Sequence, residues 1–106
     1  MNQKKKIREK FRNAVFERDG HKCIMCNNIE NLDAHHITDR SEMPNGGYVV
    51  ENGASLCPKC HEIAEFWHTS DGEYFTVGYT PCDLYEKIGS SYQIAFRKSA
   101  EFDKKT

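Results

Sequence analysis

The sequence predicts a single small α+β domain that is held together by more than its hydrophobic core. Three observations support this prediction. The chain has only 106 residues, apolar residues recur at helical spacing near both ends, and short strand-like segments lie between them. Because so short a chain buries a modest fraction of its surface, an additional crosslink is common, and the five cysteines are the first candidates for it.

The N-terminal part is expected to hold a helix and a strand joined by a turn. Apolar side chains recur on one side of residues 4–18, with Lys and Arg around the remainder, so an amphipathic helix is predicted there. Asp19-Gly20 should end this helix. Residues 23–30 are rich in Asn and should form a turn, and residues 32–37 are expected to be a short strand.

A loop, a second strand and a second helix are expected next. Residues 38–47 contain Pro and Gly and are predicted to be a loop. Asn52-Gly53 is interpreted as a turn pair that leads into a second strand at residues 54–56. A helix can begin at Pro58, and helical periodicity continues to about residue 68.

The last third of the chain differs in character and is expected to be mostly helical. Residues 73–77 are interpreted as a short strand. Thr80 should cap a helix over residues 81–89 with Pro at its first position, and Ser90 should cap a last helix. The apolar face expected for that last helix comprises Tyr92, Ala95, Phe96 and Phe102.

Cysteine usage favours metal binding in a reducing compartment. Four cysteines form the pairs Cys23-x-x-Cys26 and Cys57-x-x-Cys60, separated by 30 residues, and an odd total argues against a closed disulfide set. Neither a signal peptide nor an apolar span of roughly 20 residues is apparent, so a cytoplasmic protein outside the membrane is expected. The two pairs suit a tetrahedral, structural Zn²⁺ site of four thiolates, with iron as the alternative ion. Cys82 is left over and is expected to be a small buried apolar residue.

Positive charge is concentrated at the N-terminus. The formal net charge is -1, yet residues 1–18 carry seven Lys or Arg and two Glu, so the rest of the chain carries about -6. A basic helix of this kind can contact nucleic acid. The alternative interpretation is a helix face that is merely solvated.

Several histidines stand beside the cysteines. Asp33-Ala-His35-His36-Ile37 lies between the two pairs, and His61 follows Cys60 directly. Because four thiolates leave a zinc ion no open position, additional imidazoles indicate a second centre. Neutral imidazole can bind a divalent ion or act as a general base near working pH. His21 and His68, in contrast, are assigned to the surface or to local packing.

Three strings of residues resemble the cysteine-containing HNH endonucleases over roughly residues 15–65. The strings are Phe16-Glu-Arg18-Asp19-Gly-His-Lys-Cys23-x-x-Cys26, Asp33-Ala-His35-His36-Ile37 and Glu51-Asn52-Gly-Ala-Ser-Leu56-Cys57-Pro-Lys-Cys60-His61. The resemblance implies a ββα-metal (His-Me finger) core with a structural zinc, to which this chain adds an N-terminal amphipathic helix and a C-terminal helical extension. Residues 1–106 would then form a single HNH nuclease domain, with its core at about 15–68 and the extension at about 70–106.

The resemblance also implies catalytic roles for His36, Asn52 and His61. His36 corresponds to the general base, Asn52 to the Asn that orders a loop or touches the metal, and His61 to a ligand of the divalent ion. In the family, the residue before the base often binds the ion and is frequently Asp; here that residue is His35. Because side chains alternate along a strand, His35 and His36 can serve one site only if the strand is twisted or bent there.

Further residues near these positions are weaker candidates. Glu65 lies one helical turn after His61 and could reach the same ion, and a solvent-facing Glu is the alternative. Asp33 and Asp39 flank the expected base and could orient an imidazole. Since Mg²⁺ usually prefers oxygen ligands, a site with two His could equally use Mn²⁺, Ni²⁺ or Zn²⁺.

The resulting hypothesis is a metal-dependent endonuclease that hydrolyses phosphodiester bonds in DNA. His36 would take a proton from water while the ion stabilises the phosphate and the departing 3′ oxygen. One site nicks one strand, so a double-strand break would need a dimer or a partner protein. Small relatives occur in phage or bacterial settings such as toxins, packaging and restriction systems. The alternative hypothesis is a non-catalytic zinc-binding module that contacts nucleic acid or protein through the basic helix.

Overall fold

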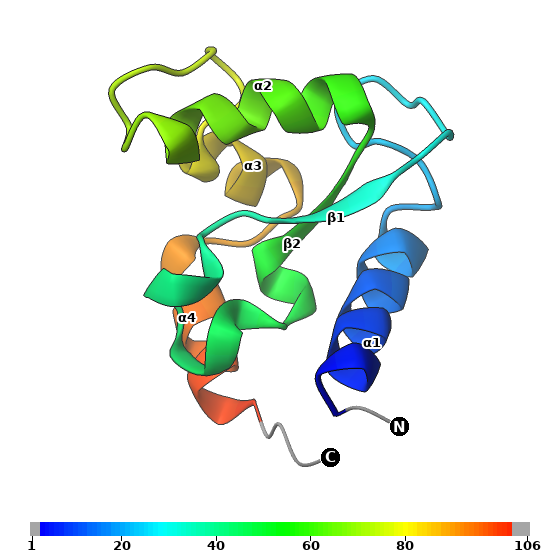
Figure 1. The fold of residues 1–106 in the computed structure, drawn as a ribbon, viewed down its shortest axis with the longest axis vertical. Helices are drawn as coiled ribbons and strands as arrows, with labels where there is room; N and C mark the ends of the chain where they lie inside the picture. Colours follow the sequence, from blue (N-terminus) through cyan, green and yellow to red (C-terminus); the bar gives the residue numbers. More distant parts are fainter. Residues whose placement is uncertain (1–2, 103–106) are drawn as a thin grey trace.

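The computed structural model describes residues 3–102 and has four α-helices around a two-stranded antiparallel sheet in that range (Figure 1). In chain order the elements are α1 (Gln3–Arg18), β1 (Asp33–His36), β2 (Gly53–Leu56), α2 (Pro58–Thr69), α3 (Pro81–Lys87) and α4 (Tyr92–Glu101). Short 3₁₀ helices at Arg40–Glu42, Pro44–Gly47 and Val50–Asn52 connect the two strands. The predicted small α+β class is confirmed.

Helix α1 packs against the sheet through the apolar stripe that its sequence predicts. Its buried residues are Ile7, Phe11 and Val15, at helical spacing. Gly53 allows the close approach of β2, because a Cβ at this position would lie 2.5 Å from Cγ2 of Val15 and 2.8 Å from Cζ of Phe11. The charged side chains of α1 therefore remain on its outer faces.

Arg18 joins the end of α1 to the second strand. Its guanidinium forms an ion pair with Asp19 at 2.7 Å and donates hydrogen bonds to the carbonyl oxygens of Val50 and Gly53. Asp19 in turn accepts a hydrogen bond from the backbone N–H of Ser55. The Arg-Asp-Gly sequence that ends α1 thus connects this helix to β2.

The two strands differ slightly from the sequence-based expectation, because β1 is shorter and β2 is one residue longer. Asp33 pairs with Leu56 and His36 with Gly53, so β2 starts one residue before the predicted strand. The interpretation of Asn52-Gly53 as a turn pair is wrong. Asn52 ends a 3₁₀ helix and is fully buried, and Gly53 has an extended backbone with φ of -125°.

Helix α2 begins where the second cysteine pair predicts it. Cys57 is the N-cap residue and Pro58 occupies the first helical position, where its missing N–H costs nothing. The helix ends at Thr69, and Cys60 and Ala64 are its buried residues. Helix α2 packs against both strands of the sheet (Figure 1).

The C-terminal helices share the buried core of the strands. Leu84 and Tyr85 of α3 and Ala95 of α4 belong to the same buried cluster as Ile37 and Leu56. Helix α3 begins at a capping box between Thr80 and Asp83, as predicted from the Thr-Pro sequence. The extension therefore covers the side of the sheet that α1 and α2 leave open.

Two expectations for the extension are wrong. Residues 73–77 form no strand: the side chains of Tyr74, Phe75 and Val77 are exposed, and no neighbouring strand pairs with them in the described range. Helix α4 is capped by Ser91 instead of Ser90.

The buried face of α4 also differs from the expected one. Small residues, Ala95 and Ser99, face the core, whereas Tyr92 and Phe96 are 45% and 43% exposed. Asn45 donates hydrogen bonds to the carbonyl oxygens of Ser99 and Phe102 and so holds the backbone of α4 close to the loop that carries Asn45. Small side chains on this face of α4 allow that close contact.

Candidate active site

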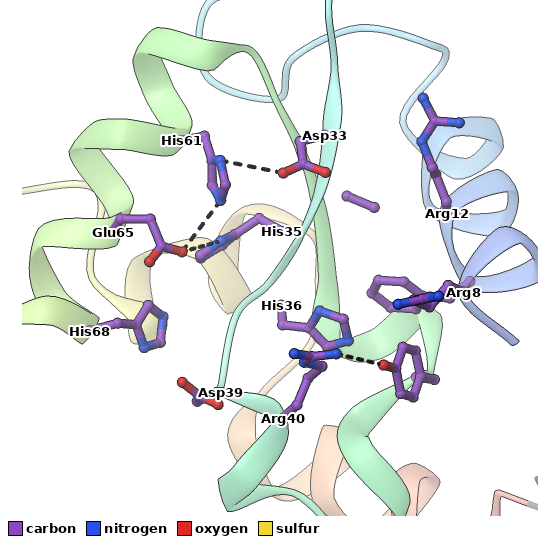
Figure 2. A pocket seen from close by; sticks show the side chains of 13 residues that line it. Arg8, Arg12, Asp33, His35, His36, Asp39, Arg40, His61, Glu65 and His68 are labelled. Carbon is purple, nitrogen blue, oxygen red and sulfur yellow. Dashed lines mark hydrogen bonds and ion pairs between the residues drawn. The ribbon is translucent and has the colours of Figure 1, made fainter. Parts of the chain in front are cut away.

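A hollow of about 410 Å³ lies along β1 between helices α1 and α2 (Figure 2). All four residues of β1 line it, and no residue of β2 does. Each strand of a two-stranded sheet keeps one edge without a partner strand, so side chains from both faces of β1 can reach the space beyond its edge. This explains how adjacent His35 and His36 meet the same hollow.

His35, His61 and Glu65 converge at the α2 end of the hollow. Oε1 of Glu65 lies 3.4 Å from Nδ1 of His35 and 3.3 Å from Nε2 of His61. One potential ligand atom of each residue lies within 4.8 Å of the others. His35 is only 3% exposed, and its Nε2 is buried without a hydrogen-bond partner in the described chain. Two imidazoles and a carboxylate at these separations fit a divalent ion.

The local structure dictates this convergence and the protonation states. His61 and Glu65 are four residues apart and so lie on one face of α2, toward His35 on β1. Burial lowers the pKa of His35, and the hydrogen bond with His35 lowers the pKa of Glu65. A neutral imidazole and an ionised carboxylate are the forms that bind metal ions.

Asp33 and His68 extend this group. Oδ2 of Asp33 lies 3.4 Å from Nδ1 of His61, on the opposite side of the ring from Glu65. The ring of His68 lies 5.5 Å from that of His35, and His68 lines the hollow. From the sequence, His68 is assigned to the surface or to local packing, and the structure places its half-buried ring in packing contact with His35 at the hollow. Its spacing after His61 and Glu65, by seven and three residues, was the signal that could have placed it.

His36 leaves β1 on the other face, toward α1. Its ring stacks on Phe11 with centroids 4.5 Å apart and meets the edge of Tyr48 at 5.0 Å. Burial, assisted by the charge of Arg40, lowers the pKa of His36 to about 4. The imidazole is therefore neutral near pH 7 and lines the hollow beside the three possible ion ligands (Figure 2).

Asn52 is buried outside the hollow and holds the loop that follows β1. Its Oδ1 accepts hydrogen bonds from the backbone N–H of Thr38 and the hydroxyl of Tyr85, and its Nδ2 donates to the carbonyl oxygens of Thr38 and Gly47. Gly47 has φ of +66°, and a Cβ there would lie 2.6 Å from Nδ2 of Asn52. Of the two roles that the resemblance implies for Asn52, this geometry fits the ordering of a loop.

Four cysteines gather at the start of α2. The sulfur atoms of Cys23, Cys26, Cys57 and Cys60 all lie within 4.8 Å of one another. A tetrahedral Zn²⁺ with bonds of about 2.3 Å separates its sulfurs by about 3.8 Å, so the cluster fits a zinc ion.

Without an ion, the cysteines of the cluster differ in pKa and Cys60 stays a neutral thiol near pH 7. Burial raises the pKa of Cys60 to about 12, whereas a backbone hydrogen bond from Cys60 lowers the pKa of Cys57 to about 7. Four thiolates at this separation would repel one another without a positive ion between them. Cys82 lies apart from the cluster and is exposed, which corrects the expectation that it is buried.

Sequence reasoning missed the basic and aromatic residues of the hollow. Arg8 and Arg12 of α1 line it, together with Arg40 and Tyr48 from the segment between the strands. A nitrogen of the Arg40 guanidinium donates to the hydroxyl of Tyr48 at 3.0 Å. Seven basic residues precede residue 19, and only tertiary packing decides which of them face the hollow.

Comparison with known families gives one match. Residues 23–65 match the family described as HNH endonuclease, a segment that contains both cysteine pairs, both strands and α2 as far as Glu65. No curated protein and no solved structure matches the chain. Within residues 3–102, no helix has the length and apolar character needed to cross a bilayer. The resemblance to the HNH endonuclease family is thus confirmed over residues 23–65, a segment with a four-cysteine cluster that could form a zinc site.

Proposed function

We propose that the protein is a metal-dependent endonuclease that hydrolyses phosphodiester bonds in DNA. One observation carries this proposal: a group of three possible ion ligands and a neutral imidazole line the same hollow at the edge of β1. The ligands are His35, His61 and Glu65, and the separate imidazole is His36. A purely structural zinc module has no need for this second group.

The ion site supplies electrostatic help. A divalent ion held by His35, His61 and Glu65 would neutralise charge on a phosphate oxygen and stabilise the departing 3′ oxygen. Two imidazoles with one carboxylate suit Mn²⁺, Ni²⁺ or Zn²⁺ as well as Mg²⁺, which prefers oxygen ligands. The four cysteines would hold a separate, structural zinc, because four thiolates leave no open position.

His36 is the proposed general base. In its neutral form it accepts a proton from a water molecule as the water oxygen bonds to phosphorus and the bond to the 3′ oxygen breaks. Phe11 and Tyr48 fix the plane of the His36 ring by stacking and edge contact. The imidazole therefore has little orientational freedom left to lose before the reaction. Asn52 acts as a positioning residue, because it ties the backbone just after β1 to the loop at Gly47.

Plasmid cleavage tests the proposal. Wild type, His36→Asn and His21→Asn are compared in EDTA and with added Mg²⁺, Mn²⁺ or Ni²⁺, while bound zinc is measured separately. His21 is an exposed histidine with φ of +58°, a conformation that Asn tolerates, so it provides the matched control.

We expect metal-dependent nicking by wild type and His21→Asn, and a loss of about 10²–10⁴-fold for His36→Asn with zinc retained. Undiminished cleavage by His36→Asn would contradict the assignment of the base. Absence of cleavage by wild type with every ion would contradict the proposed function and favour a zinc module that only binds. A linear product in addition to nicked plasmid would indicate a dimer or repeated binding, because one site cuts one strand.

A further inference from the structure

We propose that Arg8 and Arg40 bind a backbone phosphate of the DNA strand next to the scissile phosphate, on the side of His36 away from the ion site. This inference rests on the proposed function and adds the path of the substrate. It assigns a binding role to Arg8, which lies before the segment that matches the HNH family, and to Arg40, which lies within that segment but is not one of the proposed ion ligands.

The two arginines come from different elements and stand where two hollows meet. Arg8 belongs to α1, and Arg40 begins the 3₁₀ helix that follows β1. Both line the hollow at β1 and also a second one of about 480 Å³ beside it. Figure 2 shows both side chains near His36, whereas His61 and Glu65 lie on the opposite side of β1. A strand that leaves the ion site past His36 would reach these guanidinium groups next.

The charges of Arg8 and Arg40 are left without a carboxylate partner. Among residues 3–102, neither side chain forms an ion pair. Arg40 gives one hydrogen bond to Tyr48, which leaves further N–H groups for an anion. Arg18 shows the structural alternative, because its guanidinium is taken up by Asp19 and two backbone carbonyls.

The acidic residues near the hollow are engaged elsewhere. Asp33 and Glu65 contact the imidazoles at the α2 end. Asp39 lines both hollows, but its carboxylate accepts hydrogen bonds from the backbone N–H and the hydroxyl of Ser41 and caps the 3₁₀ helix. The hollow thus has an ion-binding end and a cationic end. A polyanion that crosses it would meet positive charge on both sides of the base.

Salt-dependent DNA binding tests this inference independently of cleavage. The affinity for a short fluorescent DNA duplex is measured in EDTA between 50 and 200 mM salt for wild type, Arg8→Gln, Arg40→Gln and the double variant. Arg97→Gln is the matched control, because Arg97 is an exposed arginine on α4. Arg8→Lys and Arg40→Lys test rescue by charge, and zinc content with thermal unfolding verifies that each variant is folded.

Loss of one phosphate contact should make the slope of log affinity against log salt less steep by about 0.9. The affinity of such a variant should therefore fall about threefold less than that of wild type between 50 and 200 mM salt. We expect this full change for the double variant, which loses the shared phosphate contact, and a smaller decrease in slope for Arg8→Gln and Arg40→Gln, in which the other arginine remains. Arg97→Gln and both Lys variants should keep the wild-type slope. Slopes for Arg8→Gln and Arg40→Gln equal to that of Arg97→Gln would overturn the inference, as would a wild type that does not bind DNA.

The two proposals can fail separately. If wild type nicks plasmid but the arginine variants bind like the control, the nuclease stands and the arginine site does not. If the slopes change as expected but no ion supports cleavage, the arginine site stands as a DNA-binding surface and the proposed catalysis fails.

Discussion

At the residue scale, His61 is the side chain of the site with a carboxylate near each ring nitrogen. Glu65 lies beside Nε2, where the divalent ion is proposed, and Asp33 lies 3.4 Å from Nδ1. A carboxylate on the second nitrogen holds the proton there, so the nitrogen that faces the ion keeps its lone pair. Asp33 therefore has the position of a residue that orients a metal ligand, although its own exposed fraction is high.

Replacing Asp33 should weaken ion binding without removing a ligand. We expect Asp33→Asn to lower the affinity for Mn²⁺ by about 10–100-fold, because the imidazole loses its orienting carboxylate. Calorimetric titration of zinc-loaded protein with Mn²⁺ measures this change. Glu62→Gln is the control, since Glu62 is an exposed acid beside His61 on α2. Equal affinities for the two variants would show that Asp33 does not orient His61.

At the element scale, Asn52 joins three separate parts of the chain. Its side chain forms hydrogen bonds with Thr38, two residues after β1, with the loop at Gly47 and with the hydroxyl of Tyr85 on α3. Thr38 Oγ1 lies 2.6 Å from the same tyrosine hydroxyl. The C-terminal extension thus supports the segment after β1 through a buried polar contact as well as through its apolar residues.

Removal of this junction should destabilise the fold. Asn52→Ala leaves several buried backbone groups without partners and should lower the free energy of unfolding by about 2–4 kcal/mol. Tyr85→Phe removes one donor and should cost about 1 kcal/mol. Urea denaturation measures both, with Tyr92→Phe as the control because Tyr92 is exposed on α4. A Tyr85→Phe variant as stable as this control would contradict the contribution of the hydroxyl.

The sequence predicted helices and their caps better than strands and turns. Helices α1, α2 and α3 carry local signals, namely an apolar stripe, Pro58 at the first position and the Thr80 cap. Residues 73–77 are also rich in aromatic and β-branched side chains, yet a strand forms only where another strand can pair with it, which no local pattern reveals. Asn52 looked like a turn residue because its partners are distant in sequence.

The residues of the candidate site were likewise predicted only in part from the sequence. Spacing in the sequence brought out the four cysteines, and the family pattern singled out His35, His36 and His61, which the structure brings to one hollow. The sequence did not indicate Arg40, which reaches the hollow because the 3₁₀ helix after β1 turns back toward α1.

At the scale of the whole molecule, the cysteine cluster connects the segment before β1 with the start of α2. Cys23 and Cys26 precede the strand, Cys57 caps the helix, and Cys60 stands directly before His61. An ion at the cluster would therefore fix the relative positions of the strand and the helix that carry the proposed ion ligands. Loss of zinc should affect the proposed ion site without changing any of its residues.

Cys57→Ser tests this coupling, with Cys82→Ser as the same substitution at an exposed cysteine outside the cluster. Serine is a favourable N-cap residue, so the start of α2 is preserved and the loss of a thiolate is isolated. If free zinc is at about 1,000 times its dissociation constant, its binding contributes about 4 kcal/mol to stability, which Cys57→Ser should largely remove. Zinc content, urea denaturation and Mn²⁺ titration measure the outcome. We expect zinc content, stability and Mn²⁺ affinity to fall together for Cys57→Ser and none of them to fall for Cys82→Ser, because zinc fixes β1 and α2 relative to each other. A Cys57→Ser protein that keeps its zinc and its stability would contradict a structural zinc site.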